Sequence, residues 1–338
     1  MKHKKALILL LIVFLIGTMG CGTPKSESYS RTGFFFDTVI SITIYHSDSQ
    51  LAKNALFDCF ELCKHYESLF SRMMENSDIW KINNAAGETV AVNRETYSLL
   101  QTALYYSELT DGQIDATIAP VAEAWNFSQN NEENASHIIP DHETLKELLK
   151  HVDYHNIILS EKDGKYYVSL SDAKSAVDLG FLAKGYIADR IKELLQEEGI
   201  TSAVIDLGGN ICTLGCKPDN TSFRIGIRKP FAESKTPMTV LDITDLSVVS
   251  SGNYERYFQY NGQLYHHILN TQTGYPIQNN LLQVTIISAS SMEGDALSTT
   301  CYVLGLEKGM KLIESLTGVE AIFVTEDYQL HYTSGMTQ

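Results

Sequence analysis

Two dipeptides with strong turn character, Asp163-Gly164 and Asn261-Gly262, each separate two short runs rich in β-branched and aromatic residues. In that setting Asp-Gly and Asn-Gly predict tight β-hairpins, because both central residues of the preferred turn need a positive φ. A third hairpin is expected over residues 320–334. Hairpins join antiparallel strands, and helices alternate with strands irregularly. The sequence therefore favours an α+β fold with mainly antiparallel sheets flanked by helices over a doubly wound parallel sheet.

Hydrophobic periodicity predicts the remaining elements. Residues 34–45 alternate at Ile40, Ile42 and Ile44 and predict one half-buried strand. No Pro/Ser-rich linker and no repeat divides the chain, so residues 32–338 are expected to form one domain. Further strands are predicted over 202–209 and 281–290, and helices over 50–70, 93–111, 180–199, 295–304 and 306–318.

The N-terminus has the layout of a secretory signal. A basic start, MKHKK, precedes eleven apolar residues and the small residues of GTMGC, and a membrane-spanning helix would need about 20 apolar residues. Cys21 follows Gly20 as in a bacterial lipoprotein signal, although Thr18 stands where such signals usually carry Leu. We expect a signal peptide over residues 1–20, a lipidated Cys21, a tether over 21–31 and attachment to the extracytoplasmic side of the cell membrane. Plain secretion and an uncleaved anchor are the alternatives.

The chain is acidic, with 26 Lys and Arg against 41 Asp and Glu and a net charge of −15. Residues 1–20 contain three lysines and no acids, so their removal leaves 23 basic against 41 acidic residues, a net charge of −18. Nucleic acid and anionic lipid surfaces are bound through basic faces. The composition therefore argues against nucleic acid as a partner and against broad adhesion to lipid.

Five cysteines remain beyond Cys21, an odd number that cannot all pair within one chain. Two C-x3-C spacings, Cys59/Cys63 and Cys212/Cys216, leave zinc binding as an alternative. Cys59 and Cys63 share one face of an amphipathic helical pattern, which favours thiols buried as small apolar groups.

The stretch SSMEGDALSTTCYVLG places a carboxylate and a hydroxyl one helical turn apart. Asp295 opens the expected helix, and Thr299 follows four residues later on the same face. Two interpretations are open at this point. Asp295 caps the helix while Thr299 fills a polar corner, or the two oxygens together hold a hard cation, which prefers oxygen ligands.

Five other stretches combine glycine with polar residues at the ends of predicted elements. Glycine permits positive φ and a close approach of the backbone to a ligand, although ordinary turns have a similar composition. Neither a G-x-G-x-x-G motif nor a Walker A motif occurs. The stretches are residues 110–120, 177–186, 205–210, 248–258 and 266–276.

Two of these stretches contain candidate charged or titrating residues. Lys184, in a first helical turn, opposes the helix dipole and needs Asp178, a phosphate or free solvent nearby. His266 and His267 are neighbours in a predicted strand, so only one of them can face a shared cleft. That histidine would be a candidate general base, with an ordinary surface histidine as the alternative.

Taken in order, these stretches resemble the ApbE family, the FAD:protein FMN transferases, many of which are bacterial lipoproteins. The resemblance covers nearly all of the mature chain. It implies an ApbE-like fold, FAD as substrate, a divalent cation that is usually Mg²⁺, transfer of FMN to a threonine hydroxyl of an acceptor protein, and release of AMP. The acceptor would be an extracytoplasmic subunit or domain of a redox system. The matching blocks are SELTDGQIDATIAPVAEAWNF, VDLGFLAKGYIADRI, SAVIDLGGNI, HILNTQTGYP and DALSTTCYVLG.

The resemblance also implies a set of site residues. The cation would be held by Asp295, Thr299 and the backbone carbonyl of Phe181. His267 would take the proton of the acceptor hydroxyl. This favours the cation interpretation of Asp295, since capping alone leaves Thr299 without a role. The flavin nucleotide would contact Phe36, Met73, Gln113, Ile114, Asp115, Asp178, Lys184 and Leu269.

Two stretches depart from the family pattern. Residues 270–274 read Asn-Thr-Gln-Thr-Gly where the family usually has Asp-Pro-basic-Thr-Gly, and residues 36–38 read Phe-Asp-Thr where many members have Met-Gly-Thr. The altered 270–274 loop keeps open an FAD pyrophosphatase, in which water attacks and FMN and AMP are the products. A flavin-binding lipoprotein without catalysis is a further alternative, and it would not need the Asp295/Thr299 pair.

Overall fold

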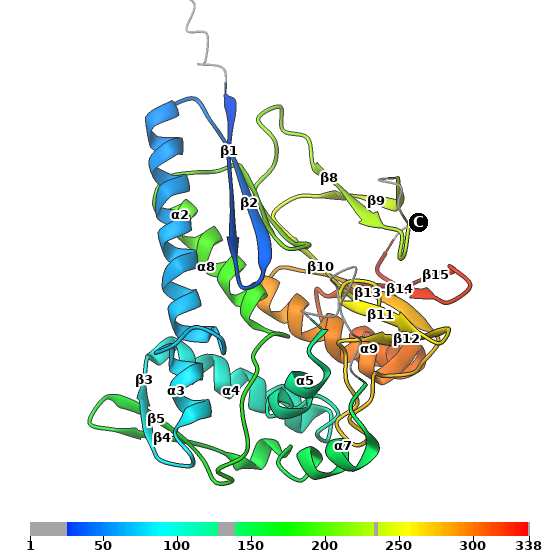
Figure 1. Cartoon of the computed structure of the whole chain (residues 1–338). Coiled ribbons are helices and arrows are strands. Elements are labelled where there is room, and N and C mark those ends of the chain that lie inside the picture. Colours follow the sequence, from blue (N-terminus) through cyan, green and yellow to red (C-terminus); the bar gives the residue numbers. More distant parts are fainter. Residues whose placement is uncertain (1–25, 128–138, 233–235, 337–338) are drawn as a thin grey trace, which may run out of the picture.

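Figure 1 shows the computed structural model, in which residues 26–127, 139–232 and 236–336 are described. The predicted signal peptide (1–20) and Cys21 lie outside the described residues. The largest sheet has eight strands, and every neighbouring pair of them is antiparallel. In spatial order they are β1 (Glu27–Phe35), β2 (Thr38–His46), β6 (Ala203–Leu207), β7 (Asn210–Leu214), β10 (Ser247–Gly252), β13 (Leu281–Ser288), β14 (Glu320–Thr325) and β15 (Leu330–Tyr332).

Three smaller sheets surround the large one, and they contain two of the three predicted hairpins. Asp163 and Gly164 form one turn with φ of 53° and 69°, and Asn261 and Gly262 form the other with φ of 50° and 78°. The third predicted hairpin is β14–β15. The expected α+β class with mainly antiparallel strands is confirmed. The small sheets consist of β3 (Val90–Val92), β5 (Lys165–Leu170) and β4 (Ile157–Lys162); of β8 (Phe223–Arg228) and β9 (Pro237–Ile243); and of β11 (Tyr257–Tyr260) and β12 (Gln263–His266).

Helices α2 (Ser49–Phe70), α8 (Ala183–Glu197) and α9 (Ser291–Glu314) pack against the large sheet, as Figure 1 shows. Their apolar faces and the buried side of the sheet form one core. The other helical segments are α3 (Asp78–Asn84), α4 (Arg94–Leu109), α5 (Ala119–Trp125), α7 (His142–Leu149) and the 3₁₀ turn η1 (Tyr154–Asn156). Within the described ranges, no helix combines the length and apolar character needed to cross a bilayer.

The predicted single strand over residues 34–45 is wrong, because a turn divides it. Phe36 and Asp37 have φ of 52° and 58° and connect β1 to β2. Strand β1 begins at Glu27, so residues 27–31, which were expected in the tether, are paired with β2. Strand β1 lies at the edge of the sheet and is largely exposed on both faces. Its sequence therefore lacks the apolar alternation that identifies a half-buried strand.

Element α9 differs from the prediction at its start, because it begins at Ser291 rather than at Asp295. The expected division into two helices, over 295–304 and 306–318, is confirmed. Gly305, with φ 78° and ψ 175°, separates them at a kink. A residue in this conformation cannot continue the helical hydrogen bonds, and glycine adopts it without steric cost.

The cysteines in the core are free thiols. Cys59, Cys63, Cys212 and Cys301 are buried among apolar side chains, while Cys216 is partly exposed. Across the described ranges, no three His, Cys, Asp or Glu side chains gather as metal ligands. The burial of Cys59, Cys63 and Cys212 supports their interpretation as small apolar groups of the core.

Candidate active site

The amino end of α9 is capped by residues other than Asp295. Ser290 is the N-cap residue, and its hydroxyl accepts a first-turn backbone N–H. The carboxylate of Asp189, on α8, accepts the Ser290 hydroxyl at 2.8 Å and the backbone N–H groups of Ser291 and Met292 at 2.7 and 3.0 Å. These contacts satisfy the free donors of the first turn. The capping interpretation of Asp295 is therefore wrong.

Asp295 instead joins α9 to the first turn of α8. Its side chain is 3% exposed, and Oδ2 accepts the backbone N–H of Gly185 at 2.9 Å. The helices approach so closely that a Cβ on Gly185 would lie 2.3 Å from the carbonyl oxygen of Ser291. Only glycine fits this crossing, and Gly185 thereby fixes Asp295 beside Lys184. The Lys184 ammonium lies 3.4 Å from Asp295 Oδ1, longer than a strong charge-assisted hydrogen bond.

The carbonyl oxygen of Phe181 lies just before α8. Leu182 is the N-cap residue of α8, so the N–H of Gly185 is one of the free donors of the first turn, and the Asp295 carboxylate accepts it. Within the described ranges no hydrogen bond reaches the Phe181 carbonyl. Three groups here are hard oxygen donors: the free carbonyl of Phe181, the loosely held carboxylate oxygen of Asp295 and the hydroxyl of Thr299. These residues fit a hard divalent cation such as Mg²⁺.

Thr299 lies one turn after Asp295 and contacts the large sheet. Its hydroxyl oxygen is 3.1 Å from the hydroxyl of Ser251 on β10. Ser251 is in turn 2.8 Å from the hydroxyl of Ser298. The polar end of β10 therefore lies against the face of α9 that carries the predicted metal ligands.

The two adjacent histidines have different environments. His266 is 4% exposed; its Nε2 donates to the carbonyl of Ile277 at 2.9 Å, and its Nδ1 accepts the N–H of Ile268 at 3.3 Å. Burial lowers the pKa of His266 to about 4. Both ring nitrogens thus hold the chain in place, and His267 is left as the candidate base.

The pKa of His267 is also lowered. Burial lowers it to about 3, and the nearby charges of Arg256 and Lys184 act in the same direction. Its Nδ1 is enclosed and has no hydrogen-bond partner in the part of the chain that the structure describes. Its backbone N–H donates to the carbonyl of Arg256 at 3.1 Å, which holds the residue in place beside β11.

Arg256 brings the β1–β2 turn to the same region. Its guanidinium lies 3.5 Å from the carbonyl oxygen of Asp37 and 3.7 Å from Asp37 Oδ2. Phe36, the neighbouring turn residue, donates its N–H to Glu67 Oε1 at 2.7 Å. The predicted contact residue Phe36 therefore lies on a turn that is fixed from two sides.

Asp178 is held in a partly exposed network at the start of the loop that leads to Lys184. Its Oδ2 accepts from Arg72 Nε at 3.1 Å, and its Oδ1 accepts the N–H of Gly180 at 2.7 Å. Arg72 also pairs with Glu123 at 2.9 Å. Met73, next to Arg72, is 78% exposed. Arg72 thus connects the segment of Met73 to the loop of Asp178.

The predicted residues Gln113, Ile114 and Asp115 form a loop after α4. The Asp115 carboxylate accepts from the N–H and hydroxyl of Thr117 at 2.7 and 2.6 Å and from the N–H of Tyr154 at 2.8 Å. Burial raises its pKa, and these hydrogen bonds oppose that shift. The carboxylate therefore fixes the loop, and Ile114 is buried beside it.

The loop over residues 270–274 is ordered by Asn270. Its side-chain oxygen accepts the N–H groups of Gln272 and Thr273 at 2.8 and 3.0 Å. Thr271 donates to the carbonyl of Gly112 at 2.7 Å, which joins this loop to the Gln113 loop. Preceding it, the Leu269 side chain packs into an apolar cluster around Trp125. The loop is thus fixed without the aspartate and proline of the family pattern.

A hollow of about 180 Å³ lies between these two loops and α9. Val303, in its wall, follows Thr299 by four residues and Asp295 by eight, so the three share one face of α9. The hollow therefore continues the stripe of predicted metal ligands along the helix, about 12 Å beyond Asp295 at 1.5 Å per residue. Its walls are formed by Gln113, Asn270, Thr271, Gln272, Ile277, Gln278, Asn279, Val303, Leu304 and Gly305.

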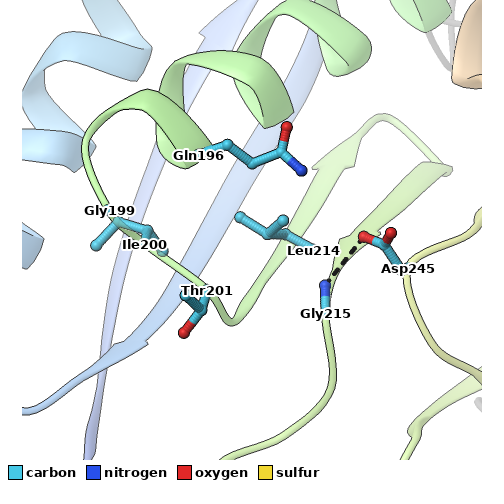
Figure 2. A pocket seen from close by; sticks show the side chains of 7 residues that line it. All are labelled: Gln196, Gly199, Ile200, Thr201, Leu214, Gly215 and Asp245. Carbon is cyan, nitrogen blue, oxygen red and sulfur yellow. Dashed lines mark hydrogen bonds between the residues drawn. The ribbon is translucent and has the colours of Figure 1, made fainter.

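A larger hollow, of about 380 Å³, contains none of the predicted residues. Figure 2 shows it at the carboxyl end of α8, lined by Gln196, Leu214 and neighbouring residues. The carboxylate of Asp245 accepts the N–H of Gly215 at 3.1 Å and pairs with Lys192 at 3.0 Å. Lys184 lies twelve residues before Gln196, about 18 Å away along α8. This hollow is therefore separate from the candidate active site.

The structure adds residues that sequence reasoning did not assign. Ser251 and Arg256 lie in the stretch 248–258, which was identified by its glycine and polar residues but received no role. Arg72 and Asp189 contact residues that are far away in the sequence, so no local pattern identifies them. Gly185 carries a weak signal as a glycine in the first turn of a predicted helix.

Fold and site together define an α+β protein in which oxygen donors, a lysine and a histidine occur in one region. The model of the ApbE family matches residues 36–323, and the chain belongs to that family. The FAD:protein FMN transferase of Treponema pallidum (strain Nichols) is 32% identical, covering 96% of this chain and 92% of its own. The FAD:protein FMN transferase of Klebsiella pneumoniae (strain 342) is 34% identical, covering 90% and 92%.

Solved structures agree with this assignment. The ApbE protein of Thermotoga maritima superposes with a TM-score of 0.80 at 30% identity, covering 91% of this chain and 97% of that one. The flavin transferase ApbE of Vibrio cholerae has a TM-score of 0.77 at 24% identity, covering 91% and 98%, and it supports the fold alone.

His266 makes stability depend on pH. Its folded pKa, about 4, is below the value of 6.5 in the unfolded chain, so the unfolded state binds more protons between these values. The contribution of His266 is fully present above pH 6.5 and is lost as pH falls toward 4, up to about 3 kcal/mol. Chemical denaturation from pH 7 to 4 should therefore show a shallower loss of unfolding free energy in His266→Gln. The same substitution at exposed His142 is the control, and parallel curves for wild type and His266→Gln would contradict the assignment.

Proposed function

We propose that this chain transfers FMN from FAD to a threonine hydroxyl of an acceptor protein, with a divalent cation, and releases AMP. Relatives that align with nearly the whole chain are named FAD:protein FMN transferases. The observation that carries the proposal is the corner where the Asp295 carboxylate, the Thr299 hydroxyl and the unused Phe181 carbonyl occur beside Lys184. Hard oxygen donors next to a cationic side chain suit a metal-bound phosphoanhydride.

The substrate would lie along α9. Its pyrophosphate would sit at the Asp295 corner, where Mg²⁺, when bound, offsets the charge that develops as the phosphoanhydride breaks. Lys184 is positioned to pair with the same phosphates, because its ammonium is only loosely held by Asp295. One end of the dinucleotide would reach the hollow near Val303, which continues the same helical face.

His267 would accept the proton of the attacking hydroxyl. The oxygen of the acceptor threonine forms a bond to the flavin-side phosphorus, the bond from that phosphorus to the AMP oxygen breaks, and the proton moves to the imidazole. A base must be unprotonated at the start, and the low pKa of His267 ensures that. The positive charges that lower this pKa would be offset by the anionic pyrophosphate, which makes the imidazole more basic when substrate is bound.

We further propose that the mature protein is anchored through a lipidated Cys21 on the extracytoplasmic side of the membrane. The paired chain begins at Glu27, six residues beyond Cys21. Six residues span at most about 22 Å. The anchored domain would therefore remain close to the bilayer, where membrane-attached redox subunits would be accessible as acceptors.

A single assay distinguishes FMN transfer from FAD hydrolysis and from simple binding. The protein is incubated with FAD, Mg²⁺ and a threonine-bearing acceptor, while AMP, free FMN and the acceptor mass are followed. Transfer predicts AMP together with an FMN-sized mass gain. Free FMN with AMP would indicate the pyrophosphatase, and absence of AMP would indicate binding alone. Asp295→Asn should retain the Gly185 contact but reduce AMP release at least about 100-fold. Glu293→Gln on the same helix is the matched control, and full activity in EDTA would exclude the metal role.

His267→Ala should slow transfer while leaving FAD binding largely intact. General-base assistance contributes about 10²- to 10⁴-fold in rate, and the loss should appear in kcat rather than in the dissociation constant for FAD. Flavin fluorescence titration measures binding, and acceptor mass measures transfer. His142→Ala on the exposed helix α7 controls for loss of a histidine elsewhere. Transfer at the wild-type rate would show that His267 is not the base.

Lipid anchoring predicts that the protein fractionates with membranes and gains a lipid mass at Cys21. Cys21→Ala should abolish the lipid mass, because the thiol that would carry the lipid is absent. Mass spectrometry of the N-terminal peptide is the measurement. An unmodified Cys21 in membrane-bound protein would contradict lipidation.

A further inference from the structure

A chain of four oxygen atoms connects β10 to the predicted metal ligands on α9. The Ser298 hydroxyl is 3.0 Å from the backbone carbonyl of Asp295, the Ser251 hydroxyl is 2.8 Å from that of Ser298, and the Thr299 hydroxyl is 3.1 Å from that of Ser251. We propose that Ser251 is a positioning residue, which orients the Thr299 hydroxyl so that its lone pairs face the cation. This inference rests on the proposed function.

The direction of the chain follows from counting hydrogens. Each hydroxyl has one hydrogen to donate, and a carbonyl oxygen can only accept. Ser298 uses its hydrogen on the Asp295 carbonyl, so in the contact with Ser251 it must accept. Ser251 then donates to Ser298 and has no hydrogen left for Thr299. The Thr299 hydrogen must therefore point to Ser251.

The orientation of the Thr299 hydroxyl determines whether its lone pairs or its hydrogen face a cation. With its only hydrogen directed at β10, its remaining lone pairs are available to bind a positive ion. In the reverse orientation Ser251 would donate to Thr299, occupy a lone pair and leave the Thr299 hydrogen free to turn toward the metal. The fixed acceptor at the Asp295 carbonyl excludes that arrangement. Ser251 and Ser298 thus act on the metal through Thr299 and do not contact it in this scheme.

The alternation of β10 explains why Ser251 reaches α9. Ser247, Val249 and Ser251 face the helix: the Ser247 hydroxyl bonds that of Ser291 at 2.9 Å, and Val249 would meet a Cβ on Gly294 at 2.9 Å. Ser250 faces the other side of the sheet, and its hydroxyl is 2.8 Å from that of Thr285 on β13. Ser250 is therefore a matched control, with the same side chain on the same strand but no connection to Thr299.

The test measures metal binding directly, with Mn²⁺ followed by electron paramagnetic resonance in the absence of FAD. Ser251→Ala removes the acceptor of the Thr299 hydrogen and should raise the Mn²⁺ dissociation constant about tenfold, as substitutions behind a metal ligand typically do. Ser298→Ala retains Ser251 but frees its hydrogen for Thr299, and should weaken binding in the same direction. Ser250→Ala should remain within about twofold of wild type. Thermal unfolding of each variant confirms that it is folded, and if Ser251→Ala is not, Ser298→Ala decides.

The outcomes separate this inference from the function on which it rests. Thr299→Val should lose Mn²⁺ affinity at least as strongly as Ser251→Ala. If wild type binds no Mn²⁺, or Thr299→Val binds as wild type does, the proposed metal site fails and the orientation argument fails with it. If Thr299→Val weakens binding while folded Ser251→Ala and Ser298→Ala bind like wild type, the metal site stands and the orienting role of Ser251 is overturned.

Discussion

The hydrogen bond from the Gly185 N–H to the Asp295 carboxylate determines the arrangement of the site. It forms because glycine allows α8 to approach the first turn of α9 more closely than any side chain would permit. The same contact satisfies a free first-turn donor of α8 and brings Lys184 to the other oxygen of Asp295. The Phe181 carbonyl, just before this turn, accepts no hydrogen bond within the described ranges. One close helix crossing thus places a carboxylate, a cation and a free carbonyl in the same short region of the chain.

Positive charge is scarce in this molecule, and two of its cations lie at the site. A chain with a net charge of −15 repels an anionic dinucleotide at long range, an effect that salt screens beyond about 10 Å. Lys184 and Arg256 lie close enough to His267 to help depress its pKa, and each is held loosely by a carboxylate, Asp295 at 3.4 Å and Asp37 at 3.7 Å. Attraction of a pyrophosphate therefore depends on these local cations and on a bound divalent ion.

The elements that were predicted correctly depend on local chemistry. Asp163-Gly164 and Asn261-Gly262 define their turns through two residues each, and the helix that contains Asp295 and Thr299 is recognisable from its 3.6-residue repeat. The turn at Phe36 was missed because neither of its central residues is a glycine. The cap of α9 has a local part that was overlooked, Ser290 with Glu293 three residues later, and a distant part, Asp189, which is 101 residues from Ser290. Likewise, Arg256 and Asp37 meet across 219 residues, and only the folded chain brings them together.

The departure of residues 270–274 from the family sequence affects which part of a dinucleotide would lie at each position along α9. Asn270 keeps the turn that an aspartate would form, but it brings no charge, and Gln272 is neutral where the family has a base. The adjoining hollow is therefore lined mainly by side-chain amides and the Thr271 hydroxyl, which both donate and accept hydrogen bonds, as the edges of aromatic heterocycles do. Charged groups lie about two helical turns away, where Asp295 on α9 meets Lys184 on α8. The arrangement favours a ring system in the hollow and phosphates at the corner, since a phosphate in the hollow would lack a cationic partner among its lining residues.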